Sequence, residues 1–131
     1  MIHQPNAFLL KAQEALAGAE VEFESDRFNN CANRCYYACF QAAIYALIRA
    51  GVPSLGKTWT HQSVQAQFIG LLINRRKLFP AELRETLHLT QSLREVGDYA
   101  EMWVTRRDAS RSLRVARAFV EAVQIREGEG S

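Results

Sequence analysis

An apolar helical run between about residues 31 and 50 constrains the fold more than any other part of the chain. Small and apolar residues fill nearly all of its helical positions rather than one face, and the run stops at Gly51-Val52-Pro53, a glycine cap followed by proline. A helix that is apolar all round has to be surrounded by other elements. We therefore expect this segment to be the central helix of a bundle.

The rest of the chain repeats the helical period and lacks the alternating pattern typical of a strand. This pattern predicts further helices over about residues 6–24, 61–74 and 80–99, and another after residue 105. Short connections between amphipathic helices favour antiparallel neighbours. The prediction is an all-α protein, an up-and-down bundle of about four to five antiparallel helices. It forms one domain over residues 1–126, and a disordered polar tail follows at residues 127–131.

Composition excludes several classes of protein. An apolar content of 48%, a charged content of 23% and a net charge of +2 are typical of an ordinary globular chain. No stretch has the length of a membrane span or the order of a signal peptide, so we expect a cytoplasmic protein without membrane association. No nucleotide-hydrolase, dinucleotide, zincin or serine-hydrolase motif occurs, so no cofactor is expected.

Three cysteines, Cys31, Cys35 and Cys39, follow one another at helical spacing in the central segment. A zinc site requires four ligands, and neither a CxxC pair nor a neighbouring histidine pair supplies the others. We expect reduced thiols that pack as small apolar side chains, and no metal.

Polar residues interrupt the apolar run. Arg34, Tyr37 and Gln41 share one face of this helix. A buried arginine needs a partner carboxylate, and Asp98 in the fourth predicted helix is the best candidate. The group is either an internal ion pair completed by tyrosine hydroxyls or a site that faces a ligand or RNA. The candidate cleft comprises Arg34, Tyr37, Gln41, Arg94, Asp98 and Tyr99.

Two further features of the sequence can be interpreted in more than one way. Arg107, Arg111 and Arg114 form a positive stripe on the last predicted helix, which is either a solvated face or a phosphate-binding surface. His61 stands where the third predicted helix begins, and we interpret it as an exposed or capping residue.

Four segments, NRCYYACFQAA, THQSV, LFPAEL and LREVGDY, occur in an order and at separations that resemble the HEPN domain family of prokaryotes. The resemblance extends over about residues 7–125. It implies a helical bundle of the nucleotidyltransferase substrate-binding-subunit type, commonly a homodimer. Some members are partners of minimal nucleotidyltransferases in toxin–antitoxin pairs. Others are metal-independent ribonucleases with an arginine followed four to six residues later by a histidine.

The chain departs from that ribonuclease pattern at two positions. Tyr99 stands where an Arg-x4-His motif beginning at Arg94 would place its histidine, and Gln41 stands where relatives often carry another. We therefore expect a non-catalytic partner, or a nucleotide- or RNA-binding subunit, that works with a separate nucleotidyltransferase. The alternative is a ribonuclease toxin in which Arg94 acts with Tyr99 or His61 as the base.

Overall fold

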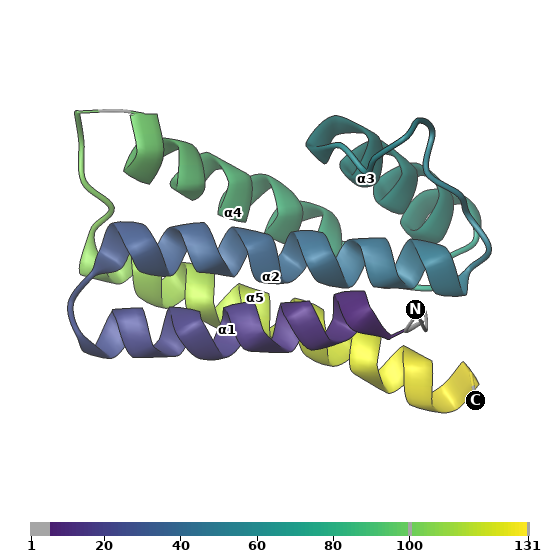
Figure 1. Cartoon of the computed structure of the whole chain (residues 1–131), viewed down its shortest axis with the longest axis horizontal. Coiled ribbons are helices and arrows are strands. Elements are labelled where there is room, and N and C mark those ends of the chain that lie inside the picture. The colour runs from purple at the N-terminus through teal and green to yellow at the C-terminus, as the bar shows by residue number, and fades with distance from the viewer. Residues whose placement is uncertain (1–5, 100, 131) are drawn as a thin grey trace.

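The computed structural model describes residues 6–99 and 101–130, with side chains up to Arg126. Its elements, in chain order, are α1 (Ala7–Glu24), α2 (Phe28–Arg49), α3 (His61–Gln67), the π-helix η1 (Phe68–Arg75), α4 (Glu82–Tyr99) and α5 (Arg106–Gly130). No strand occurs within these residues. The predicted all-α bundle is confirmed (Figure 1).

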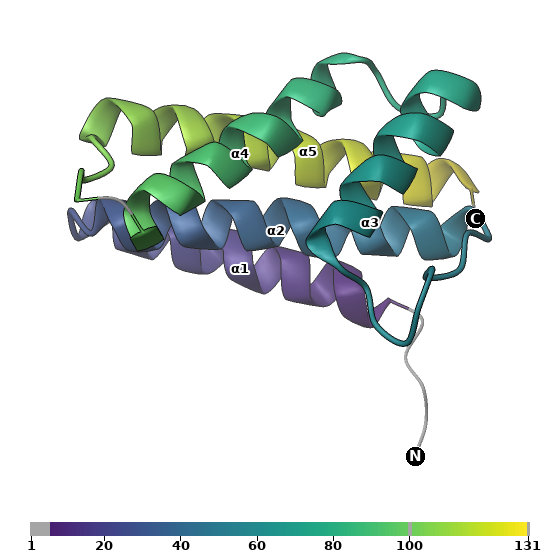
Figure 2. The same ribbon diagram turned by 90° about the horizontal axis from the view of Figure 1, so that it is seen from above.

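Helix α2 lies at the centre of the bundle, as the sequence predicts. It packs against α1, α4 and α5, and α1 and α4 lie on different sides of the α2–α5 pair (Figures 1 and 2). Thirteen of its residues are buried, and most of them are alanine or cysteine. Small side chains let neighbouring helices approach closely, so the apolar run is the contact surface of the whole fold.

The end of α2 follows from its glycine. Gly51 has a φ of 79°, its amide donates to the Ile48 carbonyl at 3.0 Å, and the Val52 amide donates to the Leu47 carbonyl at 2.9 Å. These two bonds make a Schellman motif, which requires a residue in the left-handed region. The chain leaves α2 there and enters the loop before α3.

The third predicted helix exists, but its second half has a different winding. Thr60 caps α3, since its side chain accepts a hydrogen bond from the Ser63 amide at 3.1 Å. From Phe68 the chain continues as the π-helix η1. The ring of Phe68 contacts the rings of Phe79 and Phe119, both with centroids 5.2 Å away, and thereby holds the segment on the bundle. The π-helix is rare, and its usual form, a single turn within an α-helix, is frequently found at functional sites.

Two boundaries differ from the prediction. Helix α5 continues to Gly130, past the predicted domain end at residue 126, whereas Ser131 of the predicted disordered tail lies outside the described residues. Residues 25–27 form the turn before α2, so the helix begins at Phe28 rather than after Asn30. None of the described helices is long and apolar enough to cross a membrane.

Candidate functional site

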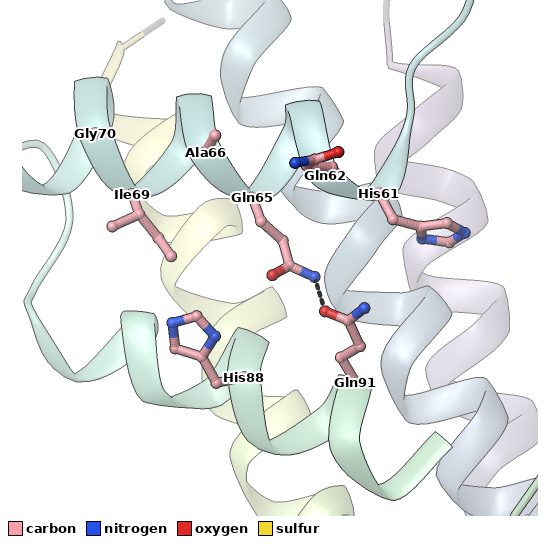
Figure 3. Close-up of a pocket in the computed structure, with 8 residues that line it drawn as sticks. All are labelled: His61, Gln62, Gln65, Ala66, Ile69, Gly70, His88 and Gln91. Atoms are coloured by element: carbon pink, nitrogen blue, oxygen red, sulfur yellow. Dashed lines mark hydrogen bonds between the residues drawn. The ribbon is translucent and has the colours of Figure 1, made fainter. Parts of the chain in front are cut away.

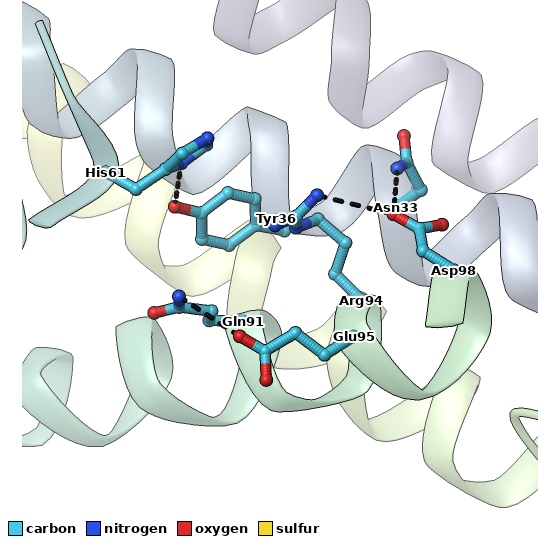
Figure 4. Close-up of polar contacts among 7 residues, drawn as sticks. All are labelled: Asn33, Tyr36, His61, Gln91, Arg94, Glu95 and Asp98. Atoms are coloured by element: carbon cyan, nitrogen blue, oxygen red, sulfur yellow. Dashed lines mark hydrogen bonds and ion pairs between the residues drawn. The ribbon is translucent and has the colours of Figure 1, made fainter. Parts of the chain in front are cut away.

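Six polar or aromatic side chains from three helices meet at one side of α2, and Figure 4 shows five of them, all except Tyr37. We call them the Arg94 cluster: Asn33, Tyr36 and Tyr37 of α2, His61 of α3, and Arg94 and Asp98 of α4. Residues 33, 36 and 37 share one side of α2, and residues 94 and 98 are one turn apart on α4. The cluster therefore follows from two helical faces that the bundle brings together.

Arg94 is the central residue of the cluster. Its side chain is only 12% exposed, and its Nη1 donates to Oδ2 of Asp98 at 3.3 Å. Asn33 Nδ2 donates to the same carboxylate oxygen, also at 3.3 Å. The guanidinium carbon lies 5.1 Å from the ring centroid of Tyr36 and 5.9 Å from that of Tyr37. One carboxylate and two aromatic faces thus compensate the partial burial of the charge.

Tyr36 connects this arginine to α3. Its side chain is fully buried, and its hydroxyl oxygen lies 2.5 Å from Nδ1 of His61 (Figure 4). The ring stacks on Phe40 with centroids 5.9 Å apart, and Phe40 also contacts the His61 ring at 4.6 Å. The imidazole is therefore held between a phenol and an aromatic face, at the point where α3 meets α2.

The electrostatics of the cluster favour neutral forms of its histidine and its buried tyrosine. Burial, and then the nearby charge of Arg94, lower the pKa of His61 below its ordinary value. Burial raises the pKa of Tyr36, against the opposing effects of the Gln65 amide and Arg94. At neutral pH the imidazole can accept the hydroxyl proton in a hydrogen bond, and Arg94 carries the positive charge of the cluster.

Arg94 keeps donor capacity beyond its bond to Asp98. Its Nε is buried and has no hydrogen-bond partner among the described residues. A guanidinium has five N–H donors in a planar fork that matches carboxylate and phosphate oxygens. The arrangement can therefore hold an anionic oxygen beside two tyrosine rings.

The structure separates the six predicted cleft residues. It assembles Tyr37, Arg94 and Asp98, but the predicted Arg34–Asp98 pair is wrong. Arg34 is exposed and lies across α1, where a Cβ at Gly18 would stand 3.1 Å from its Cδ. Because residue 18 is a glycine, the Arg34 side chain has room to lie along α1 with its charged end in water. Arg34 is therefore not buried and needs no carboxylate partner.

Among the described residues, no hydrogen bond or ring contact joins Gln41 or Tyr99 to Arg94. Gln41 is half-buried, and its Oε1 is buried without a hydrogen-bond partner among the described residues. Tyr99 ends α4 and is 76% exposed, so it is a surface residue rather than a wall of the cluster.

The predicted arginine stripe lies on the surface of α5. Arg107, Arg111 and Arg114 are all exposed, and no ion pair is found for them among the described residues. Arg117, one turn further, differs because its Nε binds Glu20 on α1 at 3.0 Å. The stripe is exposed and accessible to an anion.

The three cysteines are buried and reduced. Contact with Cys31 and burial raise the pKa of Cys35, and burial raises the pKa of Cys39 to about 12. Among the described residues, no group of three or more histidine, cysteine or acidic side chains could hold a metal. These buried thiols pack α2 against its neighbours.

The sequence reasoning missed Tyr36 as a site residue and undervalued His61. The sequence does carry a signal for Tyr36, since residues 33, 36, 37 and 40 form a helical face as regular as the face of Arg34, Tyr37 and Gln41. His61 has no helical partner nearby in the sequence, so only the position of α3 on α2 reveals its contact with Tyr36.

One comparison with known proteins gives a match. The model of the HEPN domain family matches residues 6–126, which is nearly the whole described chain. No curated protein matches the chain significantly.

Proposed function

The chain belongs to the HEPN domain family, and from this premise we propose that it is a non-catalytic nucleotide- or RNA-binding subunit. It works, as a homodimer, with a separate minimal nucleotidyltransferase in a toxin–antitoxin-like pair. The Arg94 cluster binds a phosphate group of the nucleotide or RNA. The resemblance of the sequence to partners of such enzymes supports the proposed role.

The observation that carries the proposal is the state of Arg94. It combines a mostly buried guanidinium, an Nε without a partner among the described residues and two flanking tyrosine rings. A purely structural ion pair would use more of its donors internally, because unsatisfied buried donors are costly. A phosphate oxygen would add a charge-assisted hydrogen bond to this guanidinium, and Tyr37, which is only half-buried, adds a face for stacking.

The direct test compares nucleoside monophosphates with the corresponding nucleosides by calorimetric titration. We expect the monophosphates to bind about 10-fold or more tightly than the nucleosides. Arg94→Ala should remove this advantage. Arg34→Ala is the matched control, since it removes an exposed arginine outside the cluster. Equal binding by wild type and Arg94→Ala would show that the cluster is structural.

Three large exposed side chains support the partner and homodimer parts of the proposal. Tyr99, Met102 and Trp103, at and after the end of α4, are 76%, 71% and 78% exposed. Tyrosine, tryptophan and methionine are enriched at the centres of protein interfaces. Size-exclusion chromatography of wild type and Trp103→Ser, alone and after co-expression with the neighbouring open reading frame, tests both parts. A wild-type protein that elutes as a monomer in both cases contradicts them.

One observation favours the ribonuclease alternative. The neutral imidazole of His61 and the guanidinium of Arg94 both contact Tyr36, so a general base and a cationic stabiliser lie in one cluster although no Arg-x4-His motif exists. Incubation with RNA and EDTA tests this function. Cleavage by wild type that both Arg94→Ala and His61→Ala abolish would establish it. Intact RNA, or equal cleavage by the variants, would exclude it.

A further inference from the structure

A groove lies between the α3–η1 segment and α4 (Figure 3). Gln62, Gln65, Ala66 and Ile69 line one wall, and His88 and Gln91 of α4 line the other. Its volume is about 630 Å³, within the range of pockets that hold small organic ligands. One end of the groove is His61, the same residue that contacts Tyr36 in the Arg94 cluster.

The two walls are joined by a pair of glutamines. Gln65 Nε2 donates to Gln91 Oε1 across the groove, and Gln91 Nε2 donates to Glu95 Oε1 at 3.3 Å. Figure 3 shows the carboxamide oxygen of Gln65 pointing into the space between Ile69 and His88. The groove therefore presents an acceptor to a ligand, and it offers the Gln65 donor as well once Gln91 is released.

The remaining lining selects for a planar, uncharged group. No lysine, arginine, aspartate or glutamate is among the described residues that line the groove. Ala66 and Ile69 supply an apolar surface, and the His88 ring faces them from α4 (Figure 3). The rim of the groove is open beside Gly70, where a Cβ would meet nothing within 4 Å. A heteroaromatic ring fits between such walls and can stack on the imidazole.

We propose that this groove binds the adenine base of a nucleotide whose phosphate is held by Arg94. A glutamine side chain recognises adenine in a bidentate way, with its oxygen accepting from N6 and its nitrogen donating to N7. Gln65 performs this recognition after it exchanges its bond to Gln91 for bonds to the base. Uracil has no exocyclic amino group and cannot reproduce the pair. The inference rests on the proposed phosphate-binding function, and it adds the identity of the base.

Calorimetric titration with AMP, UMP and adenosine tests the inference. We expect wild type to bind AMP about 10-fold more tightly than UMP, and Gln65→Ala to abolish the difference while it leaves UMP binding unchanged. Gln65→Glu retains an acceptor but loses the donor, so it should also lose the preference for AMP. Gln124→Ala, an exposed glutamine on α5, is the matched control. Circular dichroism establishes that each variant is folded.

The outcomes separate this inference from the proposed function. Equal binding of AMP and UMP by wild type, or a preference for AMP that survives in both Gln65 variants, overturns the adenine assignment. An Arg94-dependent gain of AMP over adenosine without any preference between bases leaves phosphate binding intact and overturns the groove. A preference for AMP that depends on Gln65 but not on Arg94 supports the groove and contradicts phosphate binding at the cluster.

Discussion

The guanidinium of Arg94 stands over the ring of Tyr36, with 5.1 Å between the guanidinium carbon and the ring centroid. This contact joins α4 to α2, and the hydroxyl at the far side of the same ring joins α2 to α3 through His61. One buried tyrosine therefore positions both residues to which we assign chemistry. Substitutions of Tyr36 that keep or remove the ring distinguish the contribution of the ring from that of the hydroxyl.

Tyr36→Phe removes the hydroxyl and keeps the ring. We expect it to lower the free energy of unfolding by about 1 kcal/mol, the usual contribution of one hydrogen bond, and to leave the Arg94 contact in place. Tyr36→Ala also removes the ring and should cost about 3–5 kcal/mol. Urea unfolding measures both, with Tyr99→Phe at the exposed end of α4 as the control. A phenylalanine variant as unstable as the alanine variant would show that the hydroxyl, not the ring, is the main contribution.

The stability of the fold should depend on the protonation of His61. Burial and the charge of Arg94 lower the pKa of His61 in the folded state, so the unfolded chain takes up this proton first as the pH falls. The contribution is therefore fully present above about pH 6.5, the unfolded value, and is lost as the pH falls through the lowered folded value. Urea unfolding at about pH 8 and about pH 5.5 should show a smaller pH effect in His61→Gln than in wild type.

His88→Gln is the control for this measurement, because His88 is exposed on α4. The same pH effect in wild type and His61→Gln would show that other groups cause it, and that the contact between His61 and Tyr36 does not depend on a neutral imidazole.

The buried thiols should be unreactive while the protein is folded. Burial shields all three thiols from a reagent, and the raised pKa of Cys35 and of Cys39, which reaches about 12, leaves these two with little thiolate at neutral pH. A colorimetric disulfide reagent should modify them slowly in buffer and rapidly in denaturing urea. Rapid modification in buffer would mean that α2 separates readily from its neighbours.

Two helical glycines should respond to alanine in opposite ways. At Gly18 the new Cβ meets the flexible end of the exposed Arg34, which can move aside. Because alanine has a higher helix propensity than glycine, Gly18→Ala should raise the free energy of unfolding by about 0.5–1 kcal/mol. At Gly97 the Cβ lies 3.3 Å from Cβ and 3.4 Å from Cα of Asn29, and that backbone cannot move so easily. We expect Gly97→Ala to be destabilising.

Thermal unfolding of the two alanine variants measures this difference directly. A destabilised Gly18→Ala would mean that Arg34 is held firmly against α1, and it would return Arg34 to the set of structurally important residues.

The helices and the central place of α2 could be predicted from periodicity alone, because a helix apolar on all sides must be surrounded. The π-helical winding of η1 could not be predicted, since the apolar residues of 68–75 have a period that suits an α-helix equally well. The boundary of α5 was also placed too early, because polar residues at a helix end differ little from a loop in the sequence.

The sequence by itself determined that this chain forms a helical bundle, that α2 is its central and largely buried helix, and that Arg94 and Asp98 share a turn of α4. Only the tertiary structure decided that Asp98 pairs with Arg94 rather than with Arg34, that Arg94 faces Tyr36, and that His61 and Gln65 reach the same region. The physical reason is that periodicity defines the faces of one helix, whereas the rotation and position of a neighbouring helix depend on how all their side chains pack together. A contact between residues 25 positions or more apart is a property of that packing.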